Sequence, residues 1–201
     1  VGFTMELCEK SIVSKEDCDG LTLRWGDAET VLALARKIAY REGFGDLLAD
    51  GTRVMAKKIG RNAERYAMQV KGLELTSVDL RVAKAYALAF AVNPRGGDHL
   101  HTNCVCQFGG SPEIVSHANR ITQTSQGANP LVANGKTLMV KWHEDMCCVS
   151  DSLGMCFFNT QSSYRVDMKI LAKLYSAATG IETTPDQMWC AGERILTLER
   201  A

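Results

Sequence analysis

The sequence predicts a mainly α-helical protein, and two features of its 201 residues lead to this prediction. Apolar residues recur at spacings of three and four through most of the chain, which is the periodicity of helices that bury one face. The alternation typical of a strand occurs in only one short stretch, at Tyr66, Met68 and Val70. We therefore expect several helices and very little sheet.

Two helices are expected in the first third of the chain. The first follows Asp27, a favourable N-cap residue, and ends at Gly43. The second runs from residue 47 to 59, although Gly51 inside it costs about 1 kcal/mol relative to alanine. The apolar residues that define the first helix are Val31, Leu34, Ala35 and Ile38.

A long loop is expected in the middle of the chain, from Gly96 to Gly135. This segment is rich in Gly, Asn, Ser and Pro and has little periodicity, apart from one helix expected at residues 113–121. Another helix is expected just before the loop, at residues 82–92. A loop of this length inside a compact domain is usually functional.

Three further helices are expected after the loop. The first leads to Asp151, the second is closed by Gly180, and the last begins at Pro185. Thr184 before this proline and Gln187 after it form a capping box. The apolar residues that mark the first two helices are Leu138, Met139, Trp142, Met146 and Val149, followed by Leu171, Leu174, Tyr175 and Ala178.

Charge and cysteine content limit the class of protein. Lys and Arg total 23, as do Asp and Glu, so nothing favours a nucleic acid or an anionic membrane as partner. No apolar run approaches the roughly 20 residues that a membrane span needs. The opening VGFTMELCEK does not resemble a signal peptide, so we expect a reducing cytoplasm. The eight cysteines are then expected to be thiols or metal ligands.

One motif, Asp-x-x-Gly followed by an aliphatic residue, occurs twice, as DCDGL at residues 17–21 and DSLGM at residues 151–155. An aspartate at a turn can accept two N–H bonds on its carboxylate. The glycine permits a positive φ, so that a flat ligand such as an aminopyrimidine edge can approach the backbone closely. Either copy alone is more often an ordinary turn between helices.

A cysteine, Cys156, directly follows the second copy of the motif. Backbone N–H groups of a glycine turn can stabilise a thiolate, and iron–sulfur clusters often take a close-spaced trio of cysteines plus one distant cysteine. A lone cysteine is more often a small buried apolar residue. The residues by themselves leave both interpretations open.

Seven stretches together resemble the aldehyde ferredoxin oxidoreductase family, and the resemblance extends over essentially the full chain. It implies a three-domain enzyme in which an amino-terminal β domain, absent from this sequence, holds two pterins and two helical domains close over the metal. Residues 1–78 resemble the latter part of helical domain 2, and residues 79–201 resemble most of helical domain 3. The stretches are MELCEK, DCDGLTLRWGDAET, KIAYREGFGDLLADG, YAMQVKGLEL, NPRGGDHL, DSLGMCFF and GERILTLER.

The resemblance also implies roles for individual residues. The first Asp-x-x-Gly motif of the family holds one pterin and the second holds the other, while the cysteine after the second motif is the fourth ligand of a [4Fe-4S] cluster. The C-x-x-C-x-x-x-C trio that supplies the other three ligands has no counterpart in these residues. The implied pterin residues are Asp17, Gly20 and Leu21, then Asp151, Gly154 and Met155, and the implied cluster ligand is Cys156.

The resemblance places His99 beside the metal, where a histidine can carry a proton during oxygen transfer. A histidine hydrogen-bonded within its own turn is the plain alternative. Asp98 stands where the family usually has cysteine, and its carboxylate is expected either to act on His99 or to point at Arg95. The family also commonly has tyrosine where Val78 stands and proline where this chain has leucine at position 80, which leaves the substrate uncertain.

The function implied by the resemblance is the oxidation of an aldehyde or related oxo compound to the acid at a tungsten or molybdenum bis-pterin centre. Electrons would pass through the [4Fe-4S] cluster to ferredoxin or an electron-transfer subunit, and a homodimer is possible. Two alternatives stay open: an inactive subunit of the same fold, and a zinc-binding helical module. The zinc ligands of that module would be His99, His101, Cys104 and Cys106.

Overall fold

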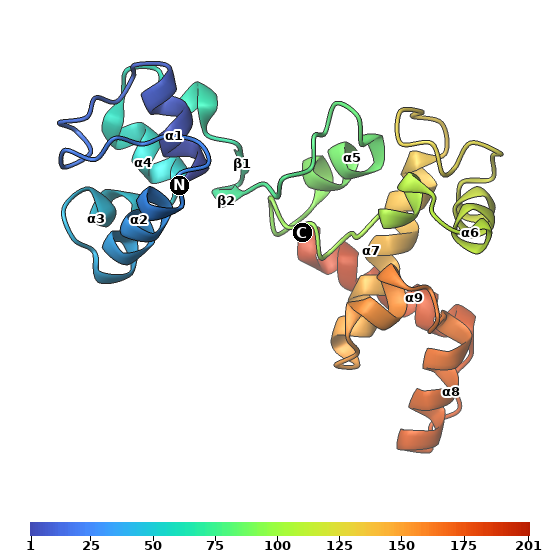
Figure 1. The fold of residues 1–201 in the computed structure, drawn as a ribbon. Coiled ribbons are helices and arrows are strands. Elements are labelled where there is room, and N and C mark those ends of the chain that lie inside the picture. Colours follow the sequence, from blue (N-terminus) through green and yellow to red (C-terminus); the bar gives the residue numbers. More distant parts are fainter. The chain divides into compact units, whose positions relative to one another are not determined.

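The computed structural model describes all 201 residues and divides them into two compact units, residues 1–75 and 76–201 (Figure 1). Helices dominate both units, and the only sheet is one two-stranded hairpin, so the prediction of a mainly α protein is confirmed. None of the helices is both long enough and apolar enough to span a bilayer. The assignment of residues 1–78 and 79–201 to helical domains 2 and 3 stays a prediction.

The first unit is built from four short helices, one 3₁₀ turn and the hairpin. Leu7, Leu34, Phe44 and Met55 are buried together at its centre. Its elements are α1 (Gly2–Glu9), α2 (Ala28–Tyr40), α3 (Phe44–Ala49), α4 (Thr52–Ile59), a 3₁₀ turn at Ala63–Tyr66, β1 (Gln69–Val70) and β2 (Leu73–Glu74). The expected alternation at Tyr66, Met68 and Val70 is therefore mostly wrong as a strand, because Tyr66 lies in the 3₁₀ turn and only Val70 in a strand.

The single helix expected at residues 47–59 is wrong, because the chain forms two helices there. Gly51 has φ of 84° and separates α3 from α4. Both the backbone N–H and the hydroxyl of Thr52 donate to Glu74 Oε1, at 2.8 and 3.1 Å. A distant carboxylate thus satisfies a donor at the start of α4, which compensates for the break.

Helix α2 begins as predicted, with the Asp27 carboxylate accepting from the Thr30 N–H. It ends at Tyr40, before the expected Gly43, because Arg41 adopts a left-handed conformation with φ of 54°. Gly43 instead allows the Asp19 carboxylate to approach the backbone closely. A Cβ atom there would lie 2.3 Å from Asp19 Oδ2, which accepts from the next N–H, that of Phe44, at 2.8 Å.

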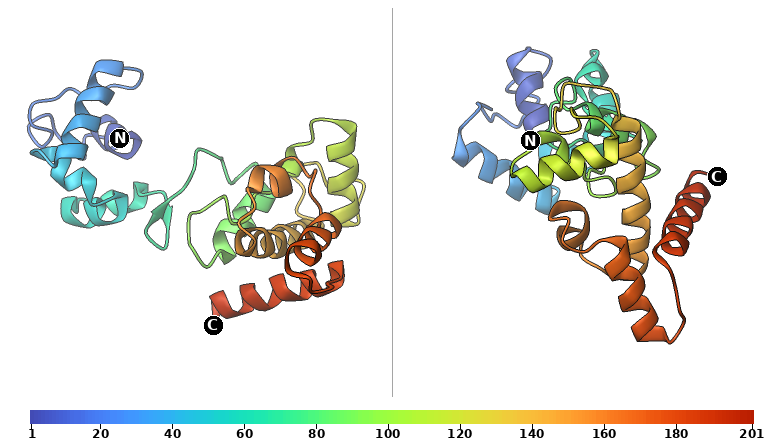
Figure 2. Two further views of the ribbon diagram at one scale, coloured as in Figure 1. Left: turned by 90° about the horizontal axis from the view of Figure 1, so that it is seen from below. Right: turned by 90° about the vertical axis from the view of Figure 1, so that its right-hand side faces the viewer.

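The second unit is organised around one long helix, α7, which packs against α5, α6 and α9 (Figures 1 and 2). Two apolar clusters lie along α7, one around Met139 and the other around Met146. The elements are α5 (Lys84–Val92), a 3₁₀ turn at Val105–Phe108, α6 (Pro112–Thr122), α7 (Lys136–Ser152), a π-helical turn at Phe158–Ser162, α8 (Met168–Thr179) and α9 (Pro185–Arg200).

The helices expected after residue 80 are all present. Gly180 closes α8 in a left-handed conformation, and both hydrogen bonds of the capping box at Thr184 and Gln187 are formed at the start of α9. One boundary differs, because Asp151 lies in the last turn of α7 and does not follow the helix.

Part of the long central loop runs through the interior of the second unit. Residues 101–104, 106 and 107 are buried, and backbone carbonyls and side chains both accept hydrogen bonds from N–H groups there, as a buried loop requires. Gln161 Oε1 accepts from the Asn103 N–H at 3.1 Å, and the Tyr164 hydroxyl accepts from the Cys106 N–H at 3.2 Å. The loop is therefore a packed part of the unit.

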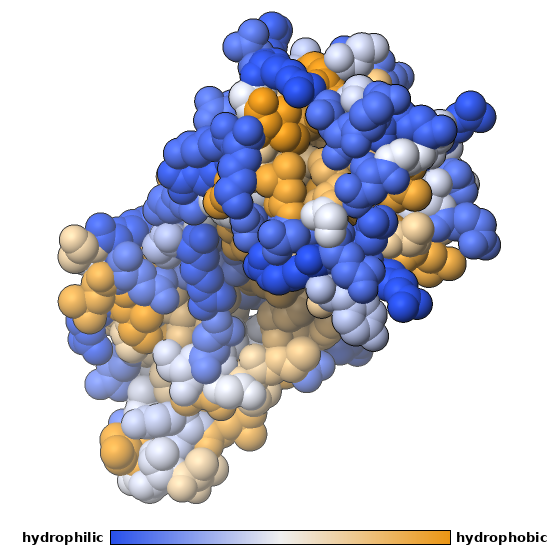
Figure 3. Space-filling view, turned by 90° about the vertical axis from the view of Figure 1, so that its left-hand side faces the viewer, coloured by the Kyte–Doolittle hydropathy of each residue, from blue (hydrophilic) through white to orange (hydrophobic).

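The surface of the chain is mixed in polarity. Hydrophilic residues cover most of the face drawn in Figure 3, with apolar residues between them. Among the exposed apolar side chains are Leu32 and Tyr40 in α2 and Leu198 in α9.

Candidate functional site

The second Asp-x-x-Gly motif forms the carboxyl end of α7. Helix α7 ends at Ser152, and Gly154 turns the chain with φ of 67°. The Met155 N–H donates to the Ser150 carbonyl at 2.8 Å, which closes the helix. A Cβ atom at Gly154 would meet no other atom within 4 Å, so the backbone there is open to a ligand.

Only one of the two oxygens of the Asp151 carboxylate accepts hydrogen bonds from the chain. Arg95 Nη2 donates to Asp151 Oδ2 at 3.0 Å, and the Cys147 thiol donates to the same oxygen at 3.6 Å. The other oxygen, Oδ1, accepts no hydrogen bond from the chain, and 44% of the side chain is exposed. Asp151 can therefore accept a hydrogen bond from a ligand without losing Arg95.

A network of hydrogen bonds in the loop at residues 93–100 positions Arg95. Asn93 Oδ1 accepts from the Arg95 N–H at 2.9 Å, and Asn93 Nδ2 donates to the Asp98 carbonyl at 2.6 Å. Asp98 Oδ2 accepts from Arg95 Nη1 at 3.3 Å, while its Oδ1 accepts from the Leu100 N–H at 2.8 Å. The Asp98 carboxylate thus binds Arg95, which was one of the two expected arrangements.

His99 lies in the same loop as Arg95, and Arg95 binds Asp151 of the second motif. The backbone of His99 is therefore close to that motif. The imidazole is half-buried and has no hydrogen-bond partner within the chain. The plain alternative, a histidine hydrogen-bonded in its own turn, is therefore not observed. Both ring nitrogens of His99 remain available to another molecule.

Cys156 is one of two exposed cysteines among the eight, the other being Cys190 in α9. Most of the others are buried, and burial raises the pKa of Cys147 and of Cys148 to about 12. The neighbouring Met155 packs against the apolar cluster around Met146, which anchors the turn that carries Cys156. The Cys156 thiol is thus accessible on an anchored turn.

The first Asp-x-x-Gly motif, in the first unit, has a similar local geometry. Asp17 Oδ2 accepts from the Ser14 N–H at 2.9 Å and from Arg61 Nη1 at 2.8 Å. Its hydrogen bond to Arg61 lowers the pKa of Asp17 to about 2. Gly20 has φ of 80° and no atom within 4 Å of an added Cβ, and Leu21 packs against the core of the unit.

The two motifs therefore share features that the sequence does not reveal. In each, an arginine binds Oδ2 of the aspartate, and the side chain is partly exposed, 37% for Asp17 and 44% for Asp151. In each, the glycine has a positive φ and faces open space. Arg61 lies 44 residues from Asp17, and no local pattern identifies it as the partner.

The zinc site of the alternative function, with ligands His99, His101, Cys104 and Cys106, does not form. Cys104 and Cys106 are buried in the apolar cluster around Met139. His101 lies instead near two residues that are distant in sequence, Cys148 and Glu199. The 3₁₀ turn that follows Cys104 places the sulfurs of Cys104 and Cys106 among apolar side chains. Histidines and cysteines that are close in sequence therefore do not form a shared metal site here.

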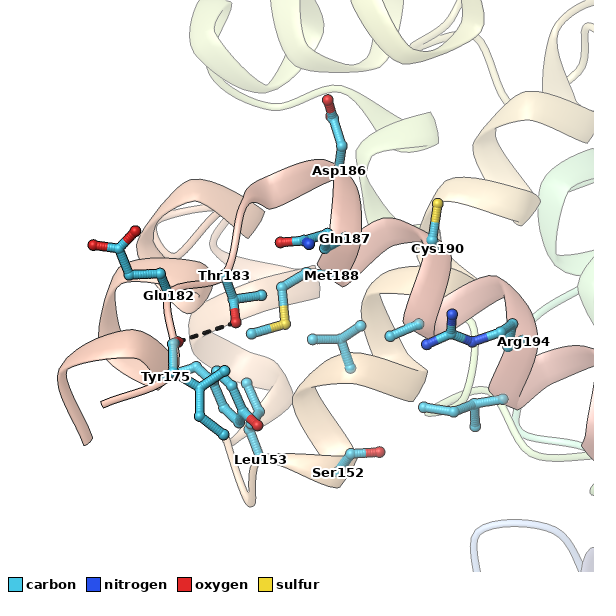
Figure 4. A pocket seen from close by; sticks show the side chains of 14 residues that line it. Ser152, Leu153, Tyr175, Glu182, Thr183, Asp186, Gln187, Met188, Cys190 and Arg194 are labelled. Carbon is cyan, nitrogen blue, oxygen red and sulfur yellow. Dashed lines mark hydrogen bonds between the residues drawn. The ribbon is translucent and has the colours of Figure 1, made fainter. Parts of the chain in front are cut away.

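A cavity of about 580 Å³ adjoins the second motif, between the end of α7, α8 and α9 (Figure 4). Ser152 and Leu153, the two central residues of the motif, line one side of it, while Tyr175 and Met188 contribute apolar walls. The carboxyl end of α7 therefore borders both the loop at residues 93–100 and this cavity.

Comparisons with known proteins identify the family of the chain. A family model described as aldehyde ferredoxin oxidoreductase, domains 2 and 3, matches residues 1–201. The chain is 34% identical over 197 residues to the tungsten-containing aldehyde ferredoxin oxidoreductase of Pyrococcus furiosus, covering 98% of this chain and 30% of that protein. It is 30% identical over 197 residues to the protein of the same name in Thermococcus kodakarensis, with the same coverage.

Two further similarities are of other kinds, one to a shorter stretch of the chain and one to a solved structure at lower identity. The WOR-like subunit of an aliphatic sulfonate oxidoreductase from Pyrococcus furiosus is 36% identical over 121 residues, which are 57% of this chain and 19% of that protein. Among solved structures, the active site complex BamBC of benzoyl coenzyme A reductase, in complex with 1,5-dienoyl-CoA, has a TM-score of 0.66 at 23% identity. That match covers 99% of this chain and 35% of the other chain, and it concerns the fold.

The chain spans about 30% of the length of its aldehyde ferredoxin oxidoreductase relatives. The family model covers it completely, and the relatives align along nearly all of it. The chain belongs to the aldehyde ferredoxin oxidoreductase family and lies within the part described as domains 2 and 3.

Proposed function

We propose that the protein containing this chain oxidises an aldehyde, or a related oxo compound, to the carboxylic acid at a tungsten or molybdenum bis-pterin centre. Electrons leave through a [4Fe-4S] cluster to ferredoxin or an electron-transfer subunit in the cytoplasm. Family membership and the names of the tungsten-containing relatives support this proposal. The observation that carries it is the shared geometry of the two Asp-x-x-Gly motifs, with the exposed thiol of Cys156 after the second.

Each motif is proposed to hold one pterin. Because the arginines occupy Oδ2, the Oδ1 atoms of Asp17 and Asp151 are open to N–H donors on the edge of a pterin. Arg61 keeps Asp17 ionised, and an ionised carboxylate is the stronger acceptor. The open backbone at each glycine lets a flat ring approach. The residues proposed to contact the pterins are Asp17, Gly20 and Leu21 for one and Asp151, Gly154 and Met155 for the other.

Cys156 is proposed as one ligand of the [4Fe-4S] cluster, with three ligands from sequence outside these 201 residues. A ligand that shares a cluster with cysteines from outside these residues must be accessible at the surface, and the Cys156 thiol is exposed whereas Cys147 and Cys148 are buried. When bound, the cluster supplies one-electron transfer. The anchored turn at Met155 keeps the sulfur in a defined position.

His99 is proposed to carry a proton to or from the substrate. Its ring nitrogens have no partner in the chain, so they are free to bind a substrate oxygen or water. The bonds among Asn93, Arg95 and Asp98 hold its backbone in place. A His99→Gln variant with normal tungsten and iron content is expected to lose most turnover, and full turnover would exclude this role.

The test of the proposed function uses the full-length protein purified without oxygen. We expect iron and either tungsten or molybdenum in wild type, and loss of the [4Fe-4S] electron paramagnetic resonance signal in Cys156→Ala. Cys190→Ala is the matched control, because it removes the other exposed cysteine. A cluster signal that survives in Cys156→Ala contradicts the ligand assignment, and a protein without tungsten or molybdenum contradicts the function.

A second candidate is a subunit of the same fold that has lost turnover. The observation that favours it is Val78, which cannot donate the hydrogen bond of the tyrosine that the family resemblance places there. This candidate predicts a protein that holds its metals but reduces no viologen dye with any aldehyde. Reduction of the dye by one aldehyde excludes it.

A further inference from the structure

Three potential metal ligands from separate elements meet in the second unit. They are His101 from the buried loop, Cys148 from α7 and Glu199 from the last turns of α9. One ligand atom from each lies within 4.8 Å of the others, and His101 Nε2 is 2.9 Å from Glu199 Oε2. Residues nearly 100 positions apart in sequence thus form one compact group.

The imidazole of His101 is fully buried but incompletely hydrogen-bonded. Its Nε2 pairs with Glu199, whereas its Nδ1 has no partner. Nε2 is the ring nitrogen that faces the carboxylate, so an ion shared with Glu199 would bind Nε2 in place of this hydrogen bond.

The charges around the group are predominantly negative. Burial is the main cause of the raised pKa of Cys148, and the nearby carboxylates of Glu199, Asp145, Glu144 and Asp151 raise it further. Arg200 pairs with Glu144 at 2.7 Å, and Lys141 pairs with Asp145 at 2.8 Å, so neither cation is paired with Glu199. The His101 imidazole is the only partner of the Glu199 carboxylate in the chain.

We propose that His101, Cys148 and Glu199 bind a divalent transition-metal ion of the Zn²⁺ class. Imidazole nitrogen, thiolate sulfur and carboxylate oxygen are the three ligand types that zinc takes in proteins. Glu199 is 34% exposed on its side chain, so water has access for a fourth position. The three ligands of this site are not among the residues proposed to contact the pterins, and none of them is the proposed cluster ligand Cys156.

Binding removes one proton from the site. The Cys148 S–H bond breaks, the sulfur–metal bond forms, and the proton leaves to solvent, while the histidine stays neutral and Glu199 stays ionised. The two negative ligands balance the charge of the divalent ion. Because the ligands come from the loop, α7 and α9, the ion would also cross-link these three elements.

The test uses full-length protein dialysed against a chelator and then titrated with Zn²⁺ or Co²⁺. We expect one ion per chain, with a thiolate-to-cobalt charge-transfer band in the near ultraviolet. Cys148→Ser should abolish this band and weaken binding more than about tenfold, and Glu199→Gln should also weaken binding. The matched controls are Cys190→Ser and Glu193→Gln, which alter α9 outside the group and should bind like wild type.

Two results overturn the proposal: no ion bound by wild type, or unchanged binding in a folded Cys148→Ser or Glu199→Gln protein. Glu199→Gln keeps the test decisive if Cys148→Ser does not fold, because Glu199 is partly exposed. Tungsten, molybdenum and iron are measured in the same samples. They should not change in these variants, so a failure of this site is distinguishable from a failure of the proposed function.

Discussion

His143 is a buried histidine in the middle of α7 with both ring nitrogens hydrogen-bonded. Nδ1 lies 2.7 Å from the Met139 carbonyl and Nε2 lies 2.9 Å from the Tyr164 hydroxyl. These contacts suit a neutral ring that donates through Nδ1 and accepts through Nε2. Burial lowers the pKa of His143 to about 3, and burial likewise lowers the pKa of His117 to about 4.

The depressed pKa of His143 predicts that the free energy of unfolding decreases in mild acid. The unfolded histidine binds a proton near pH 6.5 and the folded one does not, so stability is present above pH 6.5 and is lost as pH falls toward 3. His143 alone should contribute a loss of about 2 kcal/mol between pH 6.5 and 4.5.

The measurement is urea unfolding at several pH values, comparing wild type with His143→Gln. The variant has no titrating ring at this position, so its free energy of unfolding should decrease less steeply over this range, although its value at pH 7 is lower. Carboxylates such as Glu144, whose pKa is raised by burial, have the opposite pH dependence in both proteins and cancel in the comparison. Equal slopes would show that His143 does not titrate differently in the folded state.

At the scale of elements, the start of α9 depends on a local sequence signal. Thr184 Oγ1 accepts from the Gln187 N–H at 3.2 Å, and Gln187 Oε1 accepts from the Thr184 N–H at 2.8 Å. Thr184→Ala removes the first of these bonds and should lower the free energy of unfolding by about 1 kcal/mol.

Thr197→Ala is the matched control for this cap, because Thr197 is exposed in the interior of the same helix. It should be neutral or slightly stabilising, since alanine favours helix more than threonine. Chemical unfolding of the two variants measures the difference. A Thr184→Ala protein as stable as wild type would mean that α9 is held by packing alone.

The close contact between α7 and α9 depends on Gly192, because glycine has no side chain. A Cβ atom at Gly192 would lie 2.5 Å from the Asp145 carbonyl oxygen, which is backbone and cannot move independently. Glycine in an exposed helix costs about 1 kcal/mol relative to alanine, but here the close approach of the helices outweighs that preference.

Gly192→Ala should therefore destabilise the protein by roughly 1–3 kcal/mol, in spite of the better helix propensity of alanine. Gly2→Ala is the control, because a Cβ at Gly2 in α1 would meet its nearest atom at 3.8 Å. Thermal unfolding monitored by circular dichroism compares the two. A stabilised Gly192→Ala protein would contradict the observed distance between α7 and α9.

At the scale of the whole molecule, the two units have separate cores. Leu34 is buried in the core of residues 1–75, and Leu171 is buried in a core of residues 76–201. Burial of apolar surface is the main stabilising contribution to each. Damage to one core should therefore remain largely within its own unit.

Leu34→Ala should lower the local free energy of unfolding by about 2–5 kcal/mol. Amide hydrogen exchange followed by mass spectrometry should become faster in α2, α3 and α4, with α7 and α9 unchanged. Leu171→Ala is the reciprocal variant and should accelerate exchange in α7 and α8 instead. Faster exchange throughout the chain in either variant would show that the units unfold together.

Most of the fold follows from local signals in the sequence. The mainly helical class, the N-cap at Asp27, the closing Gly180 and the capping box at Thr184 were all predictable, because each depends on residues within one or two helical turns. The prediction at residues 47–59 was wrong, because a distant carboxylate, Glu74, caps a second helix there. The family was also predicted from the order of motifs along the sequence, and the family model that matches residues 1–201 confirms it.

The sequence by itself determined the helices, the two motifs and the family. Only the tertiary structure decided which side chains meet. In the tertiary structure, Asp17 is paired with Arg61, and Asp151 is paired with Arg95. His101 does not share a site with Cys104 and Cys106, and it lies with Cys148 and Glu199 instead. The physical reason is that helix periodicity and caps act over a few residues, whereas these contacts depend on how α7, α9 and the buried loop pack, which no local pattern specifies.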